Sequence, residues 1–234
     1  MCGRYVLRVI LKNFRRDFEL GFDVDDSDVP MEVRPRYNIA PTQNVWAVTE
    51  SNEERSLSLL QWSLVPNWSK KPAGFINARA ETLETKPSFK EAFIRRRCLI
   101  PADGFYEWEK LGKAKQPHYF QMKNAEPFFF AGIWDDWQLD GRSIKSCAII
   151  TTTANKLLAA IHDRMPVIVP HDALDGWLRS SAKVSELREF FSPFPDSEME
   201  GFPVGQEVNG SASDHPGLVE RLPANELVRN GMLF

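Results

Sequence analysis

Short apolar runs separated by Gly, Pro and charged residues recur along the chain, a pattern that predicts many short β-strands. We expect strands over residues 45–49, 57–65, 98–100, 105–108, 118–122, 127–133 and 146–151. Helical spacing of apolar positions predicts helices over residues 6–20, 170–179 and 183–191. A capping box at Ser88 predicts a short helix to Arg96, and Thr153 is expected to cap another that runs to residue 161. Loops are expected over residues 23–30, 38–43 and 66–74.

No internal repeat or linker separates these elements, so we expect residues 1–234 to form one domain. A length of 234 residues is ample for a sizeable hydrophobic core. The mixture of strands and helices predicts an α+β fold. Its centre is expected to be a curled, mostly antiparallel, barrel-like sheet that helices flank.

The composition, 43% hydrophobic and 26% charged residues, is ordinary for a soluble globular protein. No apolar run is long enough to span a membrane, and Arg4, Arg8 and Lys12 interrupt any secretory signal. The three cysteines lack a CxxC spacing and the four histidines are scattered, so we expect no disulfide framework, no metal and no cofactor. A monomer in a reducing, bacterial-type cytoplasm is the expected form, associated with the nucleoid when it acts on DNA.

The net charge of −3 gives no global sign of nucleic-acid binding, but the charges are unevenly distributed. Residues 70–115 hold 11 Lys and Arg against 6 Asp and Glu. This excess indicates a local basic surface in the first half of the chain. A solvated charged face explains the counts equally well.

The chain begins Met1-Cys2-Gly3-Arg4-Tyr5, and the small side chain at position 2 predicts removal of Met1. Cys2 would then carry a free α-amine beside its thiol. A 1,2-aminothiol condenses with an aldehyde to a Schiff base, after which the thiol closes a thiazolidine ring. Both groups are partly activated near neutral pH, with ordinary pKa values of about 7.7–8.0 and about 8.5. Alone, the residue is more simply explained as a tolerated cysteine near a chain end.

Three further residues offer acid, base or hydrogen-bonding chemistry. Glu107 lies between Tyr106 and Trp108, where desolvation would raise its pKa and suit a general acid or base. His162, just before a Met-Pro pair, could shuttle protons, and the Asn77 amide could orient a sugar or a carbonyl. Ordinary structural roles exist for all three: an ion pair with Arg, a core histidine and a turn.

Other residues are of types that contact nucleic acids. Arginines can hold phosphates in bidentate geometry, and loop aromatics or prolines can stack on or wedge between bases. Surface salt bridges, packing at the edge of the core and β propensity are their alternatives. The candidates are Arg4, Arg79, Arg164, Trp68, Pro41 and the hydroxyl of Thr151.

These segments together resemble the SRAP family, the SOS-response-associated peptidase-like proteins that shield abasic sites. The matching motifs are MCGRY, NIAPTQ, WSLVPNW, INARAET, PSF, RRCLIPADGFYEW, the QP before His118, ITTTAN and HDRMPV. The resemblance runs from Cys2 to about residue 170 and weakly to residues 202–204 and 208–209. The combination is specific, although no single motif is.

The resemblance implies that Cys2 attacks the ring-opened aldehyde of an abasic site in single-stranded DNA and forms a thiazolidine crosslink. It implies that Asn77 positions the α-amine and the sugar. Glu107 would be a general acid/base, and His162 would assist proton transfer, β-elimination and reversal of the crosslink. DNA contacts are implied for Arg4, Pro41, Trp68, Arg79, Thr151 and Arg164, and for Lys86 on weaker grounds.

Two other function classes stay open at this point. An N-terminal cysteine also serves as the nucleophile of peptidases and amidohydrolases, a proposal that the family's older name reflects. A binder of single-stranded DNA without any covalent chemistry is the third possibility. Adduct formation with abasic DNA, turnover of an amide substrate, or salt-sensitive binding alone would distinguish the three.

Overall fold

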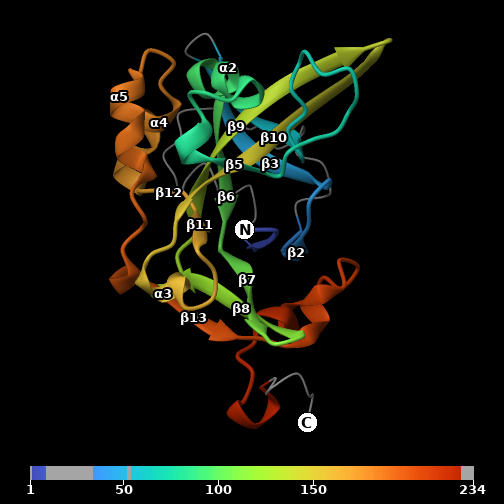
Figure 1. The fold of residues 1–234 in the computed structure, drawn as a ribbon, viewed down its shortest axis with the longest axis vertical. Helices are drawn as coiled ribbons and strands as arrows, with labels where there is room; N and C mark the ends of the chain where they lie inside the picture. Colours follow the sequence, from blue (N-terminus) through green and yellow to red (C-terminus); the bar gives the residue numbers. More distant parts are fainter. Residues whose placement is uncertain (1, 9–33, 52–53, 228–234) are drawn as a thin grey trace.

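Antiparallel strand pairs dominate the computed structural model, which describes residues 2–8, 34–51 and 54–227 (Figure 1). The strands are β1 (Arg4–Leu7), β2 (Arg36–Ile39), β3 (Asn44–Ser51), β4 (Glu54–Trp62), β5 (Asn77–Arg79), β6 (Arg97–Ala102), β7 (Gly104–Leu111), β8 (Ala114–Met122), β9 (Phe128–Leu139), β10 (Arg142–Thr153), β11 (Arg164–Pro166), β12 (Ile168–Val169) and β13 (Met199–Pro203). The α-helices are α2 (Pro87–Arg95), α3 (Lys156–Ala159), α4 (Leu174–Leu178) and α5 (Val184–Leu187). Short 3₁₀ turns complete the chain, among them residues 171–173 and 188–191.

Five strands close into a barrel. Strand β10 pairs with β4 and β9, β4 pairs with β3, β3 with β6, and β6 with β9, so the ring returns to its starting strand. Only the pairings of β10 with β4 and with β5 are parallel among those described. A second sheet, in the order β13-β8-β7-β1-β2, lies against the barrel. The predicted α+β fold with a curled, mostly antiparallel core is confirmed.

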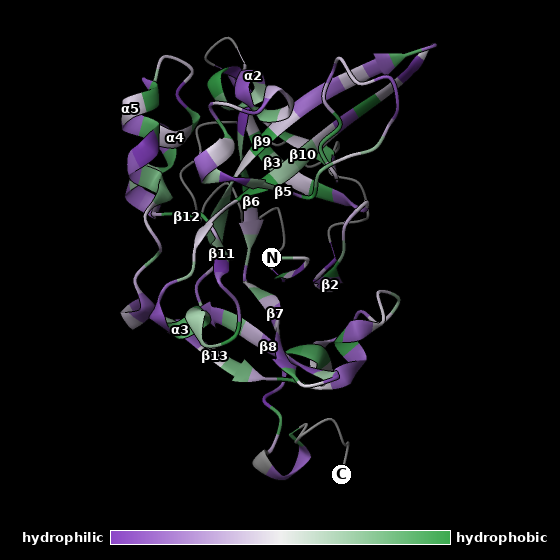
Figure 2. Ribbon diagram, in the orientation of Figure 1, coloured by the Kyte–Doolittle hydropathy of each residue, from purple (hydrophilic) through white to green (hydrophobic). Residues whose placement is uncertain are grey.

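Buried residues form clusters on both sides of the barrel wall. One cluster packs beneath α2 and α4 and includes Phe93 and Trp177. The other joins the barrel interior to the second sheet and contains Cys2, Tyr5 and Trp62. Strands β9 and β10 each carry a continuous apolar run, residues 128–133 and 147–150, that is buried at every position, because one face of the barrel wall packs inside the barrel and the other packs under the helices. Figure 2 shows hydrophilic positions towards the end of this pair of strands that projects from the barrel. The N-terminal strand therefore lies inside the core, which holds residue 2 in place.

A buried arginine ties two helix ends to the barrel. Arg97, at the start of β6, is 3% exposed. Its guanidinium donates to the carbonyls of Phe93 (2.8 Å) and Ile94 (2.6 Å) in α2, and of Trp177 (2.8 Å) and Arg179 (2.7 Å) at the end of α4. These carbonyls are acceptors that a helix end leaves without an intrahelical donor.

We expect Arg97→Met to lower the free energy of unfolding by about 3–5 kcal/mol, because several buried carbonyls would lose their donors. Urea denaturation at pH 7 measures the change. Arg95→Met, at an exposed position of the same helix end, is the matched control and should change stability by no more than about 0.5 kcal/mol. Equal stability of the two variants would contradict this role.

All seven predicted strands are present and most are longer than expected, but some local predictions are wrong. The predicted helix over residues 6–20 is strand β1 through Leu7, and residues 9–20, like the loop over residues 23–30, lie outside the described part. Residues 38–39 belong to β2 rather than to a loop, because they pair with β1. Lys86, followed by Pro87, occupies the N-cap of α2 instead of Ser88, and Asn155 caps α3 instead of Thr153.

Candidate functional site

Residue 2 is held where β1, β5 and β7 meet. Cys2 is fully buried and lies two residues before the start of β1 at Arg4. Asn77, the first residue of β5, donates from Nδ2 to the carbonyl oxygen of Cys2 at 2.9 Å. The Oδ1 atom of Asn77 is buried and has no hydrogen-bond partner among the described residues. The amide therefore fixes the backbone of residue 2 and keeps one acceptor for another donor.

A carboxyl group lies beside the cysteine. Strand β7 pairs with β1, with Tyr106 opposite Arg4, and this pairing brings Glu107 next to residue 2. Glu107 is 2% exposed, and burial raises its pKa above the ordinary range, against the opposing effect of His162. Burial, reinforced by the charge of Glu107, also raises the pKa of the Cys2 thiol. The thiol thus stays protonated at neutral pH until a base takes its proton.

His162 completes the group from the turn after α3. Its Nδ1 accepts a hydrogen bond from the backbone N–H of Arg164 at 3.0 Å, which places the proton of the neutral ring on Nε2. The same Nδ1 lies 3.0 Å from the Oδ1 atom of Asp163, an exposed carboxylate.

An asparagine in the segment ITTTAN sets the position of that turn. Asn155 accepts from the backbone N–H of Leu158 at 3.0 Å and donates to the carbonyl of Phe194 at 2.8 Å. The backbone N–H of His162 in turn donates to Leu158 at 2.9 Å. Helix α3 is only four residues long, so this capping interaction is a main determinant of where His162 lies.

A second group of polar residues lies on neighbouring strands. Strand β5 places Arg79 opposite Thr151, and β11 continues the sheet with Arg164. The guanidinium of Arg164 forms a bidentate pair with Glu81 (2.6 and 2.9 Å) and donates to the carbonyl of Thr151 (2.6 Å). Its hydrogen bonds lower the pKa of Glu81. Arg79 is exposed, whereas the Thr151 hydroxyl is buried without a partner among the described residues.

Arg4 ties the N-terminal strand to a distant segment of the chain. Its guanidinium donates to Asn38 Oδ1 at 2.9 Å and to the carbonyls of Val208 (2.8 Å) and Asn209 (3.3 Å). Asn38 itself donates to the carbonyls of Val208 and Gly210. Residues 208–209, where the family resemblance is weak, therefore accept hydrogen bonds from Arg4 of the MCGRY motif.

Of the other predicted contact residues, Trp68 and Lys86 are exposed, as Arg79 is, whereas Pro41 is partly buried. Trp68 is 60% exposed in the loop after β4, and Lys86 is exposed at the start of α2. Pro41 occupies the turn between β2 and β3, which Thr42 fastens to the end of β4 through a 2.8 Å backbone hydrogen bond to Trp62. The indole of Trp62 donates to the carbonyl of Ile76, so this turn lies close to the strand that carries Asn77.

Three side chains from β9 and β10 anchor the loop that contains Trp68. Ser146 accepts from the backbone N–H of Val65 at 2.8 Å, and Asp135 accepts from that of Asn67 at 2.9 Å. The indole of Trp137 donates to the carbonyl of Ser69 at 2.7 Å. An exposed aromatic ring on an anchored loop is preorganised for stacking, because little freedom is lost when it binds.

We expect Asp135→Asn to loosen this loop. Asp135 accepts from the backbone N–H groups of Asn67 and Asp136 with separate oxygens, and an amide supplies only one acceptor oxygen. One partly buried N–H then loses its acceptor, at a cost of about 0.5–1.5 kcal/mol. Hydrogen exchange at residues 65–69 should accelerate, whereas Asp136→Asn on the same strand should leave it unchanged. Slow exchange in Asp135→Asn would show that the other anchors suffice.

Sequence reasoning missed several residues that support the site. Glu81 lies in the motif INARAET and Asn38 in NIAPTQ, so both were within recognised segments. Their partners are distant along the chain: Glu81 pairs with Arg164, and Asn38 with Arg4 and residues 208–213. No local pattern indicates such a pairing. For Glu81, the only signal in the sequence was its place two positions after the candidate Arg79.

Within residues 2–8, 34–51 and 54–227, no group of three His, Cys, Asp or Glu side chains is arranged to hold a metal ion. The helices in the same ranges are all too short or too polar to cross a membrane.

Comparison with known proteins places this arrangement in a family. The abasic site processing protein YoqW of Bacillus subtilis is 38% identical over 226 residues, covering 94% of this chain and 99% of that protein. YedK of Escherichia coli, also named an abasic site processing protein, is 30% identical over 94% of this chain and 99% of its own length. HMCES of Xenopus tropicalis is 29% identical, and the match covers 82% of this chain and 66% of that protein.

A solved structure shares the fold of this chain. A crystal structure of a protein from Bacteroides thetaiotaomicron superposes with a TM-score of 0.83 at 25% identity, over 95% of this chain and 100% of that one. The family profile described as SOS response associated peptidase (SRAP) matches residues 1–211. This chain belongs to the SRAP family.

Proposed function

We propose that this protein processes abasic sites in DNA through a covalent reaction of Cys2. After removal of Met1, the α-amine of Cys2 attacks the aldehyde carbon of the ring-opened sugar, and loss of water gives a Schiff base. The thiol then adds to the C=N carbon: a C–S bond forms, and the thiol proton ends on the nitrogen. No oxidant or cofactor is required, and the product is a thiazolidine.

The observation that carries the proposal is the position of Asn77, Glu107 and His162 around residue 2. Asn77 holds the Cys2 carbonyl, which fixes the direction of the amine. Glu107, with its raised pKa, can give a proton to the departing hydroxyl and then accept the thiol proton. Such a base is needed, because burial keeps the thiol protonated.

His162 is the proposed proton carrier for the competing reaction. A Schiff base at C1′ acidifies the C2′ protons, so a base that removes one of them cleaves the strand by β-elimination. Ring closure by the thiol diverts the same intermediate into the crosslink. One residue with two nucleophilic groups therefore sets the ratio of strand cleavage to trapping.

Single-stranded DNA is the proposed substrate form, and the exposed residues around the site support a path for it. In this proposal the exposed Trp68 and the partly buried Pro41 stack on or wedge between bases, and the exposed Arg79 and Lys86 meet phosphates. Arg4, Arg164 and Thr151 form the inner edge of this path. Arg4 is already hydrogen-bonded to Asn38, and Arg164 to Glu81. For direct contact with a phosphate, each arginine has to release this partner or bind both groups at once.

Intact-mass spectrometry tests the proposal directly. The purified protein is measured before and after mixing with single-stranded DNA that carries one abasic site. Loss of Met1 followed by a heat-stable adduct is the expected result. A processed protein that forms no adduct would contradict the proposal and favour a non-covalent DNA binder.

An amidohydrolase that uses Cys2 receives less support. The relatives at 38% and 30% identity are both named abasic site processing proteins. The aldehyde reaction begins at the amine and uses the thiol only in its second step. Turnover of a peptide or amide that Cys2→Ser abolishes would reverse this preference.

A further inference from the structure

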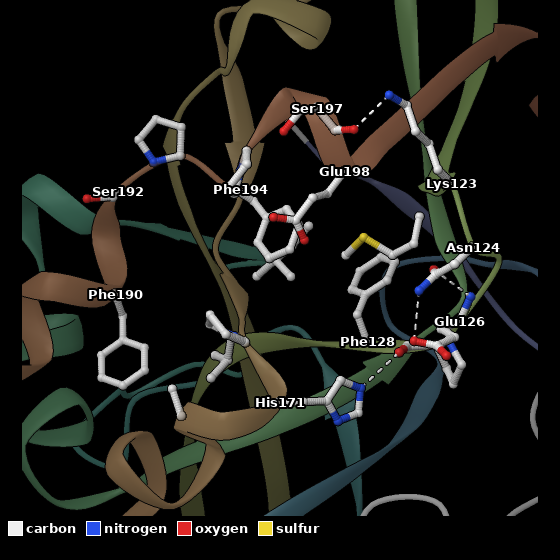
Figure 3. Close-up of a pocket in the computed structure, with 18 of the residues that line it drawn as sticks. Lys123, Asn124, Glu126, Phe128, His171, Phe190, Ser192, Phe194, Ser197 and Glu198 are labelled. Carbon is white, nitrogen blue, oxygen red and sulfur yellow. Dashed lines mark hydrogen bonds between the residues drawn. The ribbon is translucent and has the colours of Figure 1, made fainter.

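A cavity of about 820 Å³ lies outside the group around Cys2, as none of Cys2, Asn77, Glu107 and His162 lines it. Three segments form its walls: residues 122–128 between β8 and β9, residues 168–173 from β12 onward, and residues 189–198. Figure 3 shows side chains from all three segments around one space, with Phe194, Phe128 and His171 on different sides. The volume is within the range of about 300–1,000 Å³ typical of small-molecule sites.

Hydrogen bonds between the segments fasten the walls of the cavity to one another. Lys123 donates from Nζ to the carbonyl of Ser197 at 2.6 Å, and from its backbone N–H to Glu198 at 2.9 Å. On the other side, Nε2 of His171 lies 3.3 Å from the carbonyl of Pro127, to which it donates. The cavity is therefore preformed, so a ligand would not bear the cost of ordering it.

The inner surface is largely apolar. Phe128 and Ile168 are 2% and 4% exposed, and both belong to the hydrophobic cluster that also contains Cys2. Phe194 and Phe190 are only partly buried and close the opposite side. Aromatic and aliphatic walls of this kind favour a ligand with an apolar body.

The charged groups of the lining are mostly acidic. Glu126, Glu189 and Glu198 are exposed at the cavity, against the single ammonium group of Lys123, which binds the Ser197 carbonyl. A ligand that places a cation near these carboxylates complements them, whereas an anion is repelled. The same charges disfavour the phosphates of DNA, so this cavity does not extend the proposed DNA path.

We propose that the cavity binds a small organic cation with an aromatic or aliphatic body. The apolar walls take the body, and the three carboxylates take the positive group. The proposal rests on the cavity and its charges and is independent of the reaction at Cys2, so each can fail without the other.

Matched indole probes test it. Tryptamine carries an ammonium, 3-ethylindole is neutral and indole-3-propionate is anionic, and binding to the full chain is followed by NMR titration. We expect saturable binding of tryptamine with a dissociation constant of about 1 mM or below, given the usual binding energy per atom of small ligands. The neutral probe should bind more weakly, and the anion should not bind measurably.

Two variants locate the binding. The triple change Glu126→Gln, Glu189→Gln and Glu198→Gln should weaken tryptamine binding about fivefold or more and leave 3-ethylindole unaffected. Ala173→Leu, which fills part of the cavity, should weaken both probes. Glu220→Gln, at an exposed position away from the cavity, is the control. The triple variant changes only exposed side chains, so it keeps the test decisive if Ala173→Leu does not fold.

Three results would overturn the proposal: no saturable binding of tryptamine, equal binding of all three probes, or tryptamine affinity unchanged in the triple variant. A fourth concerns the source of the ligand. If the peptide acetyl-Trp-Lys-Trp-Lys-amide binds at least tenfold more tightly than tryptamine, the occupant is a segment of a partner protein, and the small-molecule assignment is wrong.

Discussion

Replacing Cys2 with alanine is expected to abolish the heat-stable adduct with abasic DNA and to leave non-covalent DNA affinity within about twofold. Alanine is also small, so removal of Met1 should continue and expose an α-amine. That amine can still form a Schiff base, but no thiol is present to close the ring. The intermediate then hydrolyses or undergoes β-elimination, so strand cleavage should persist where crosslinking is lost. Denaturing gel electrophoresis of end-labelled DNA separates the two outcomes.

Borohydride trapping makes this prediction sharper. Reduction should capture the Schiff base of Cys2→Ala as an adduct that does not form without the reductant. The other two cysteines provide matched controls, since Cys98 and Cys147 are equally buried but lie within the barrel. Cys98→Ala and Cys147→Ala should keep adduct formation. A heat-stable adduct in Cys2→Ala without borohydride would rule out the thiazolidine.

The strands could be predicted because each has a local signal, whereas the closure of the barrel could not. Alternating or continuous apolar runs mark β6 to β10 directly in the sequence. The parallel pairing of β10 with β4 and β5 joins segments that are far apart, and no short-range pattern encodes it. Residues 6–7 show the opposite failure: their apolar spacing suits a helix, but the pairing of Val6 with β7 and of Leu7 with β2 overrides this local preference.

The site residues also divide into those with a local signal in the sequence and those whose contacts come from distant segments. Glu107 was predicted to be desolvated between aromatic neighbours, and it is buried with a raised pKa. The hydrogen bond from Asn77 to Cys2 joins residues that are 75 positions apart, so only the family resemblance could suggest their proximity. The protein partners of Arg4 and Arg164 likewise come from distant segments, and no property of either arginine alone indicates them.

Glu107→Gln is expected to slow adduct formation by about 10²–10⁴-fold, the usual contribution of a positioned general acid/base. Glutamine keeps the size of the side chain but cannot give or accept the proton. Single-turnover kinetics with abasic single-stranded DNA measure the effect. Glu109→Gln, two residues along the same strand and paired with His118 at 3.0 Å, is the control and should keep the wild-type rate. Equal rates in wild type and Glu107→Gln would remove Glu107 from the mechanism.

The stability of Glu107→Gln relative to wild type should depend on pH. The raised pKa of Glu107 in the wild-type protein determines the direction of this dependence. Because burial raises the pKa of Glu107 above its ordinary value of 4.5, the folded state holds this proton more tightly than the unfolded chain does. The resulting stabilisation is fully present below pH 4.5 and is lost as pH rises through the folded-state pKa. Glutamine never ionises. The stability of the variant relative to wild type should therefore increase between pH 4 and pH 8, as measured by urea denaturation at both values.

These two results together separate a chemical role from a structural one. A variant that is slower at every pH, yet gains stability relative to wild type as pH rises, has lost a proton-transfer group rather than its fold. The wild-type protein would then keep a buried, ionisable carboxyl beside Cys2 at a cost in stability, as functional sites commonly do. A relative stability that falls with rising pH would instead mean that ionised Glu107 is stabilised in the fold, which contradicts its proposed role as the proton donor.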